Sequence, residues 1–158
     1  MALPQKHLIL LWTVCPGWWR DNQEYYQGIE ELAINLDNGI THGSNRTQFI
    51  KRVVQFSCET RLKIRLIYYP PYHSKYNPIE RCWAILENYW NGAILDSRET
   101  TIAWASNMTW KGNHPSIHLV EDTYEKGITV AAPELSFLQQ FWQRSESLPK
   151  WDVTIVPP

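Results

Sequence analysis

The stretch LAINLDNG, residues 32–39, decides the fold class because it joins a short apolar segment directly to a tight turn. Residues 32–36 are mostly apolar and have the length of a strand, which predicts a short buried strand. Asp37-Asn38-Gly39 follows at once, and these residue types are typical of turns. Asp37 is therefore expected at the point where the strand ends.

The next two elements predict an α/β fold. Residues 46–56 place apolar side chains at helical spacing with basic side chains between them, which predicts an amphipathic helix. Residues 61–69, RLKIRLIYY, alternate basic and apolar side chains in the manner of a strand, and Pro70-Pro71 ends it. A strand, a helix and a strand in this order predict a right-handed crossover and a parallel strand pair.

A further helix is expected from Pro78 to about Trp90. Asn77 has the residue type of an N-cap, Pro78 suits the first helical position, and Glu80 falls at the third. For the remaining chain we expect a buried strand or irregular segment at residues 8–15 and a helix at 18–28. Residues 132–144 predict a last helix, and residues 151–156 predict a terminal strand.

The composition describes a folded protein of one domain or two small ones. The chain has 158 residues, of which 44% are hydrophobic and 20% charged, and no apolar run is long enough for a membrane span. Its nine tryptophans are expected mostly in the core. The three cysteines lie far apart and form no CxxC, which argues against structural zinc and a disulfide scaffold and favours a cytoplasmic location.

Charge is distributed unevenly, although the net charge is only −1. Residues 40–79 hold seven basic residues and one acid, whereas the segments on either side are acidic. A basic block between acidic flanks is typical of a surface that faces a polyanion. A solvated helix face and an edge strand would give the same pattern, and charge alone does not separate the two interpretations.

Two carboxylates are candidates for chemistry. Asp37 ends a predicted parallel strand, where active-site groups gather in open α/β sheets, although an Asp in such a turn can be a turn former only. Glu80 lies in the first turn of its helix, where it can act in a capping box with Asn77. If the two carboxylates converge, their oxygens suit a hard divalent cation, and two such ions can support phosphoryl transfer.

Several stretches resemble DDE transposases of bacterial insertion sequences, in particular the Rhodopirellula-type transposase domain group. The resemblance covers about residues 18–156, and residues 70–80 are its most specific part. Residues 77–80, with the tryptophan that follows, are also similar to mariner-type enzymes, more distantly. The stretches are Asn35-Leu36-Asp37-Asn38-Gly39, Arg46-Thr47-Gln48-Phe49, residues 68–83 (YYPPYHSKYNPIERCW), and Met108-Thr109-Trp110-Lys111-Gly112 with His114-Pro115.

The resemblance implies a ribonuclease-H-like fold and a catalytic triad of Asp, Asp and Glu that binds Mg²⁺ or Mn²⁺. Asp37 matches the second acid and Glu80 the third, so both are expected to be catalytic and metal-binding. The first acid and the first antiparallel strands of the fold have no counterpart. We therefore expect a partial fold, with a divergent segment at residues 1–17 and the C-terminal part of the catalytic domain at residues 18–158.

The implied function is metal-dependent DNA strand cleavage and transfer in transposition of an insertion sequence. The expected partners are transposon ends and target DNA, with Arg46, Lys51, Arg52 and Lys75 as DNA-binding residues. Because the first acid is missing, the chain is expected to be inactive by itself, and an uncovered strand edge is expected to favour self-association. Two alternatives remain at this point: a non-catalytic nucleic-acid-binding remnant, and a glycosidase using the same carboxylates, which the resemblance disfavours.

Overall fold

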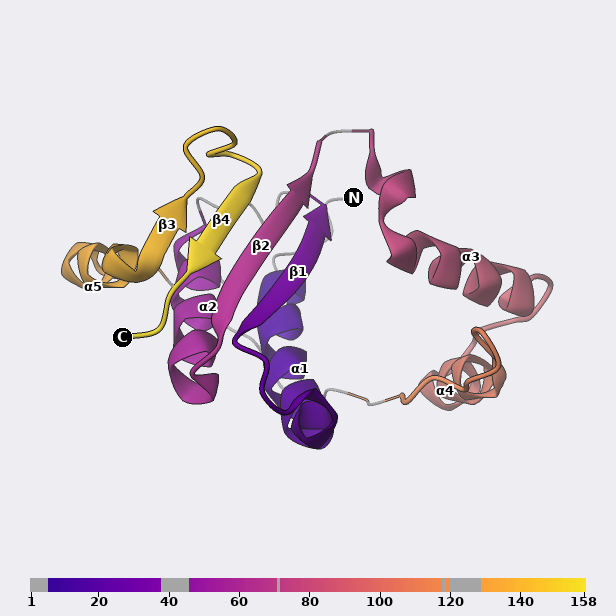
Figure 1. Cartoon of the computed structure of the whole chain (residues 1–158). Coiled ribbons are helices and arrows are strands. Elements are labelled where there is room, and N and C mark those ends of the chain that lie inside the picture. The colour runs from indigo at the N-terminus through magenta and orange to yellow at the C-terminus, as the bar shows by residue number, and fades with distance from the viewer. Residues whose placement is uncertain (1–5, 38–45, 71, 118, 120–128) are drawn as a thin grey trace. The chain divides into compact units, whose positions relative to one another are not determined.

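The computed structural model describes residues 6–37, 46–70, 72–117, 119 and 129–158, which form two compact units (Figure 1). The first unit comprises Met1–Pro71 and Asp122–Pro158, and the second comprises Tyr72–Glu121. The first holds a sheet with helices against it, and the second holds two helices. Asp37 belongs to the first unit and Glu80 to the second.

The sheet of the first unit has four strands in the order β1-β2-β4-β3. Strands β1 (Glu31–Asp37) and β2 (Lys63–Tyr69) are parallel and in register from Glu31 opposite Lys63 to Asp37 opposite Tyr69. Strand β4 (Asp152–Ile155) runs antiparallel to β2, and β3 (Trp142–Arg144) runs antiparallel to β4. The predicted strand, helix and parallel strand are therefore confirmed, and so is the terminal strand.

Helix α2 (Thr47–Thr60) makes the crossover between the parallel strands, and its apolar side forms the core. Phe49 and Val53 are fully buried, and Phe56 is nearly so. The helix ends where Arg61 takes a left-handed backbone conformation with φ of 60°. There the buried Ser57 hydroxyl donates to the Leu62 carbonyl at 2.7 Å, which satisfies a polar group inside the core.

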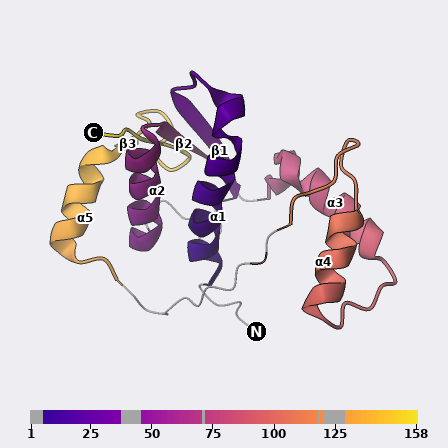
Figure 2. The same cartoon turned by 90° about the horizontal axis from the view of Figure 1, so that it is seen from below.

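Alternation along the strands gives the sheet one apolar and one polar face. Ile64, Leu66 and Tyr68 of β2 are buried, whereas Lys63 and Arg65 between them are exposed. On the apolar side α2 packs between α1 (Lys6–Asn22) and α5 (Ala132–Leu138), and the three helices lie in a row (Figure 2). This period-two burial is what the alternating sequence of residues 61–69 predicts.

The expectation of a strand or irregular segment at residues 8–15 is wrong, because these residues belong to α1. Cys15 and Trp19, four residues apart, both pack against the core, so the segment buries one side at helical and not strand spacing. The helix also continues through Pro16. The helix expected at residues 18–28 therefore begins earlier, and a 3-10 turn (Gln23–Tyr26) follows before Gly28, whose φ of 81° suits a stop.

The prediction of a last helix over residues 132–144 is correct only for its first half. Helix α5 ends at Leu138, a 3-10 turn covers Gln139–Phe141, and Trp142–Arg144 form β3 instead of continuing the helix. Pairing with β4 outweighs the local helical pattern there, since Trp142 lies opposite Ile155 in the antiparallel register. Tertiary pairing of this kind cannot be read from the segment itself.

In the second unit the helices are α3 (Pro78–Trp90) and α4 (Arg98–Asn107). They contact each other, and the rings of Tyr89 and Trp104 meet edge to face with centroids 5.4 Å apart. Helix α3 nevertheless has no buried residue, and half of the Trp83 surface is exposed. The expectation that most tryptophans lie in the core is wrong, because no tryptophan with a described side chain is fully buried.

Strand β1 is an edge of the sheet, since β2 is its only neighbour among the strands that the structure describes. The parallel pair thus leaves one row of β1 backbone groups without a strand partner in the described part of the chain. Residues 8–14, for which the sequence allowed a strand, are helical and so add no strand to this edge. Self-association through the edge stays a prediction.

Candidate functional site

Asp37 is the last residue of β1, as the sequence predicts, and it pairs in register with Tyr69 at the end of β2. The carboxyl ends of the two parallel strands therefore lie at the same end of the sheet, beyond which ligands bind in open α/β folds. Asn38 and Gly39, which complete the predicted turn, lie outside the described residues.

Glu80 lies in the first turn of α3, and the helix start is formed without its side chain. Asn77 is the N-cap, and its side-chain oxygen accepts from the Ile79 amide at 3.5 Å. The Asn77 carbonyl accepts from the Glu80 amide at 3.1 Å. Glu80 is exposed, and its carboxylate has no hydrogen bond or ion pair with any residue that the structure describes. The capping box is therefore not formed, and the carboxylate remains available to a ligand.

The meeting of Asp37 and Glu80 at a shared metal site stays a prediction, because the two residues belong to different units. Within the described residues no three His, Cys, Asp or Glu side chains gather as a ready-made metal site. The structure therefore describes the two candidate residues separately. Asp37 ends a strand of the first unit, and Glu80 of the second unit carries a carboxylate without a described partner.

The seven basic residues of the basic block, residues 40–79, differ in their exposure and in their ion pairs. Six of the seven are exposed, and Lys51 is half-buried. Among the described residues, Lys51 pairs with Glu134 at 2.7 Å, Lys63 with Glu31 at 2.8 Å, and Arg65 with Asp152 at 2.6 Å. Lys51 is therefore less suited to phosphate binding than the exposed Arg46, Arg52 and Lys75. DNA binding by these residues stays a prediction.

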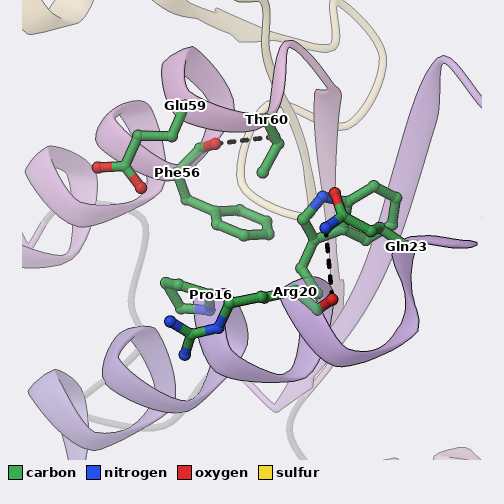
Figure 3. Close-up of a pocket in the computed structure, with 7 residues that line it drawn as sticks. Pro16, Arg20, Gln23, Phe56, Glu59 and Thr60 are labelled. Carbon is green, nitrogen blue, oxygen red and sulfur yellow. Dashed lines mark hydrogen bonds between the residues drawn. The ribbon is translucent and has the colours of Figure 1, made fainter.

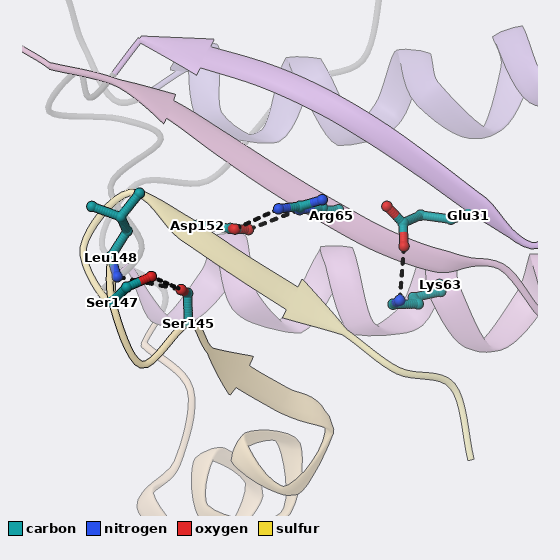
Figure 4. A network of polar contacts seen from close by, with 7 residues as sticks. All are labelled: Glu31, Lys63, Arg65, Ser145, Ser147, Leu148 and Asp152. Carbon is teal, nitrogen blue, oxygen red and sulfur yellow. Dashed lines mark hydrogen bonds and ion pairs between the residues drawn. The ribbon is translucent and has the colours of Figure 1, made fainter.

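Two of these ion pairs lie on the polar face of the sheet, where Figure 4 shows them next to each other. The Arg65 guanidinium donates two hydrogen bonds to Asp152, at 3.0 and 2.6 Å, and so binds it bidentately across the β2–β4 pair. Lys63 and Glu31 face each other across β1 and β2. Both basic side chains of β2 are thus paired with acids within the sheet, which the basic pattern of residues 61–65 does not reveal.

The Arg65–Asp152 pair predicts loss of stability in acid. The hydrogen bonds from Arg65 lower the pKa of the Asp152 carboxyl, so the folded chain holds this proton less readily than the unfolded chain. The stabilisation is complete above the unfolded pKa, about 4, and is lost as the pH falls through the lowered folded value. The urea midpoint of Asp152→Asn should therefore fall less between about pH 5 and about pH 3 than that of the wild type. Asp21→Asn is the control and should keep the wild-type acid dependence; an Asp152→Asn curve parallel to the wild type contradicts the prediction.

A cleft of about 290 Å³ lies between α1 and α2 (Figure 3). Pro16 and Phe56 give it apolar walls, and Arg20 and Glu59 are its charged residues. It contains a single carboxylate and so does not supply the paired carboxylates expected of a metal site. Burial raises the pKa of the nearby Cys15 thiol to about 11, so this thiol stays protonated at neutral pH and is no nucleophile.

The sequence offers the four tyrosines between residues 68 and 76 together as candidates to stack bases beside the basic block, and the structure distinguishes one of them, Tyr72. Its side chain is 98% exposed, and its backbone has a φ of 64°, a left-handed conformation that is unusual for an aromatic residue. The four tyrosines between residues 68 and 76 are alike in sequence, and only their burial distinguishes them. The adjacent prolines signal a turn but do not show which ring is exposed.

The four-stranded sheet with its parallel β1–β2 pair and flanking helices defines an α/β protein with a partial ribonuclease-H-like fold. A model of the Rhodopirellula transposase DDE domain family matches residues 13–157, so the chain belongs to this family of DDE transposases. No curated protein and no solved structure matches the chain. No helix among the described residues is long and apolar enough to cross a membrane.

Proposed function

We propose that Asp37 and Glu80 are catalytic metal ligands for DNA strand cleavage and transfer during transposition of an insertion sequence. The observation that carries this proposal is the Glu80 carboxylate, which is exposed and unpartnered among the described residues although it lies at a helix start. Because the capping box is not closed, Glu80 supports the helix start only through the helix dipole, and its carboxylate oxygens stay open to a ligand. The reaction is the one carried out by DDE transposases. The proposed substrate is cytoplasmic DNA, at the transposon ends and at the target site.

The residues fit a hard divalent cation such as Mg²⁺ or Mn²⁺. Both proposed ligands are carboxylates, whose oxygens these ions prefer, and the Glu80 carboxylate has no ion pair with a basic residue that the structure describes. A bound ion of this kind supplies charge stabilisation and an activated oxygen nucleophile in phosphoryl transfer. Asp37 and Glu80 would hold it, and the exposed Arg46, Arg52 and Lys75 would hold the DNA backbone by its phosphates.

Two carboxylates are one short of the family's triad, and this leads to a prediction about the isolated chain. The purified 158-residue protein, incubated with supercoiled plasmid and Mg²⁺ or Mn²⁺, should bind DNA without nicking it, because two carboxylates would hold the ions less completely than the three of the family's triad. Gel electrophoresis of the plasmid measures the nicked fraction. Nicking that disappears in Asp37→Ala or Glu80→Ala would contradict the expected inactivity and would show that another residue replaces the first acid.

The second candidate function is a nucleic-acid-binding remnant without catalysis. The exposed Arg46, Arg52 and Lys75 favour it, because a DNA-binding surface requires these charges but no metal. Salt-sensitive DNA binding is common to both proposals, so binding of a divalent metal by the two carboxylates distinguishes them. A chain that binds DNA but no Mn²⁺ would support the remnant.

A further inference from the structure

The segment between β2 and α3 carries an aromatic side chain, that of Tyr72, which no contact with a described residue holds in place. Tyr72 is 98% exposed, and no ring contact or hydrogen bond joins it to a described residue. Its φ of 64° lies in the left-handed region, which costs free energy for a residue with a bulky side chain. The free-energy cost and the exposure of a large ring together suggest a role in binding a ligand.

The structure separates Tyr72 from its three neighbouring tyrosines. Tyr68 is 3% exposed and belongs to the core, and Tyr69 is half-buried at the end of β2. The Tyr76 ring is occupied, because the His73 ring stacks on it at 5.8 Å and Lys75 Nζ lies 5.2 Å from its centroid. Tyr72 is therefore the one of the four whose ring faces are open to a planar ligand.

A positive charge lies close to this open ring along the chain. Lys75 is exposed and belongs to a short 3-10 turn (Ser74–Tyr76), which the Tyr76 amide closes by donating to the His73 carbonyl at 3.0 Å. The contact with the Tyr76 ring restrains the Lys75 ammonium. An open aromatic ring and, three residues later, a restrained cation offer single-stranded nucleic acid a surface for a base and a charge for its phosphate.

We propose that Tyr72 stacks on an unpaired DNA base and that Lys75 binds a neighbouring phosphate. This rests on the proposed function, in which DNA is the substrate, and it identifies a contact in the same unit as Glu80. Both residues belong to the segment that precedes α3, the helix that carries Glu80 in its first turn. Tyr72 is accordingly a positioning residue that holds a strand near this helix start, and it takes no part in the chemical step.

The test is a titration of the full chain into a single-stranded oligonucleotide that carries 2-aminopurine, whose fluorescence is quenched by stacking. Tyr72→Ala should weaken binding roughly tenfold and remove the quench. Tyr72→Phe should keep both, and Tyr72→Leu, which retains apolar volume without a π-face, should behave like the alanine variant. Tyr25→Ala is the matched control, because Tyr25 is 85% exposed in the other unit, and it should bind as the wild type does.

Lys75→Gln separates the charge from the ring. It should keep the quench while the slope of log K against log salt becomes shallower by about 0.7, the contribution of one phosphate in a single strand. Circular dichroism establishes that each variant is folded. Equal binding and equal quench in Tyr72→Ala and wild type would overturn the inference and leave the proposed function standing. A wild-type chain that binds neither single-stranded nor duplex DNA would overturn both.

Discussion

Replacing Glu80 with glutamine is expected to weaken Mn²⁺ binding by the chain at least tenfold while leaving the fold intact. Glutamine keeps the size of the side chain and removes the negative charge that a hard cation requires. The helix should persist because its start depends on Asn77 and Pro78, and the Glu80 carboxylate bonds to neither. Losing an acid from the first turn should cost only about 0.3–1 kcal/mol through the helix dipole.

Isothermal titration calorimetry or electron paramagnetic resonance of Mn²⁺ measures the affinity, and circular dichroism measures the helix content. Glu87→Gln is the matched control, because Glu87 is another exposed acid of α3 that lies beyond its first turn. Asp37→Asn should behave like Glu80→Gln, since both residues are proposed to bind the same ions. Equal affinities for Glu80→Gln and Glu87→Gln, or no Mn²⁺ binding by the wild type, would contradict the metal-binding proposal.

Replacing Phe49 with alanine is expected to lower the free energy of unfolding by about 3–5 kcal/mol. Phe49 is fully buried on the apolar side of α2, in the cluster that includes Val53, Ile64 and Leu66. Truncation removes the ring's contacts and leaves a cavity in this cluster. Because domains are stable by only about 5–15 kcal/mol, this loss removes a large share of the stability of the first unit.

Urea unfolding followed by circular dichroism measures this loss. Gln55→Ala is the control on the same helix, since Gln55 is exposed and its side chain accepts only a long 3.5 Å hydrogen bond, from Arg52, among the residues that the structure describes. Its effect should stay within about 0.5 kcal/mol. A loss below about 1 kcal/mol for Phe49→Ala would mean that the cluster around α2 is not the core that stabilises the first unit.

Much of the fold follows from local pattern. Residues 32–37 and 63–69 form strands and residues 47–60 form a helix, because the period of their apolar residues is 2 in the first case and 3.6 in the second. The start of α3 follows from Asn77 and Pro78, whose backbone preferences act within one turn. Residues 8–15 show the limit of this reasoning, since a short continuous apolar run suits a strand or a helix equally well.

The candidate site was predictable as residue types and chain positions but not as contacts. Asp37 at a strand end and Glu80 in a first helical turn follow from neighbouring residues alone. Whether Glu80 closes a capping box depends on a side-chain rotamer, which the sequence does not specify. The same holds for the tyrosines of residues 68–76, whose burial depends on packing against the rest of the fold.

The sequence by itself determined the parallel strand pair, its crossover helix, the helix start before Glu80 and the family, because each depends on residues close together in the chain. Only the tertiary structure decided which basic residues pair with distant acids. Lys51 pairs with Glu134, and Arg65 pairs with Asp152, 87 residues away. Such partners meet only when the sheet and its helices assemble, and an ion pair between distant residues leaves no local pattern from which to predict it.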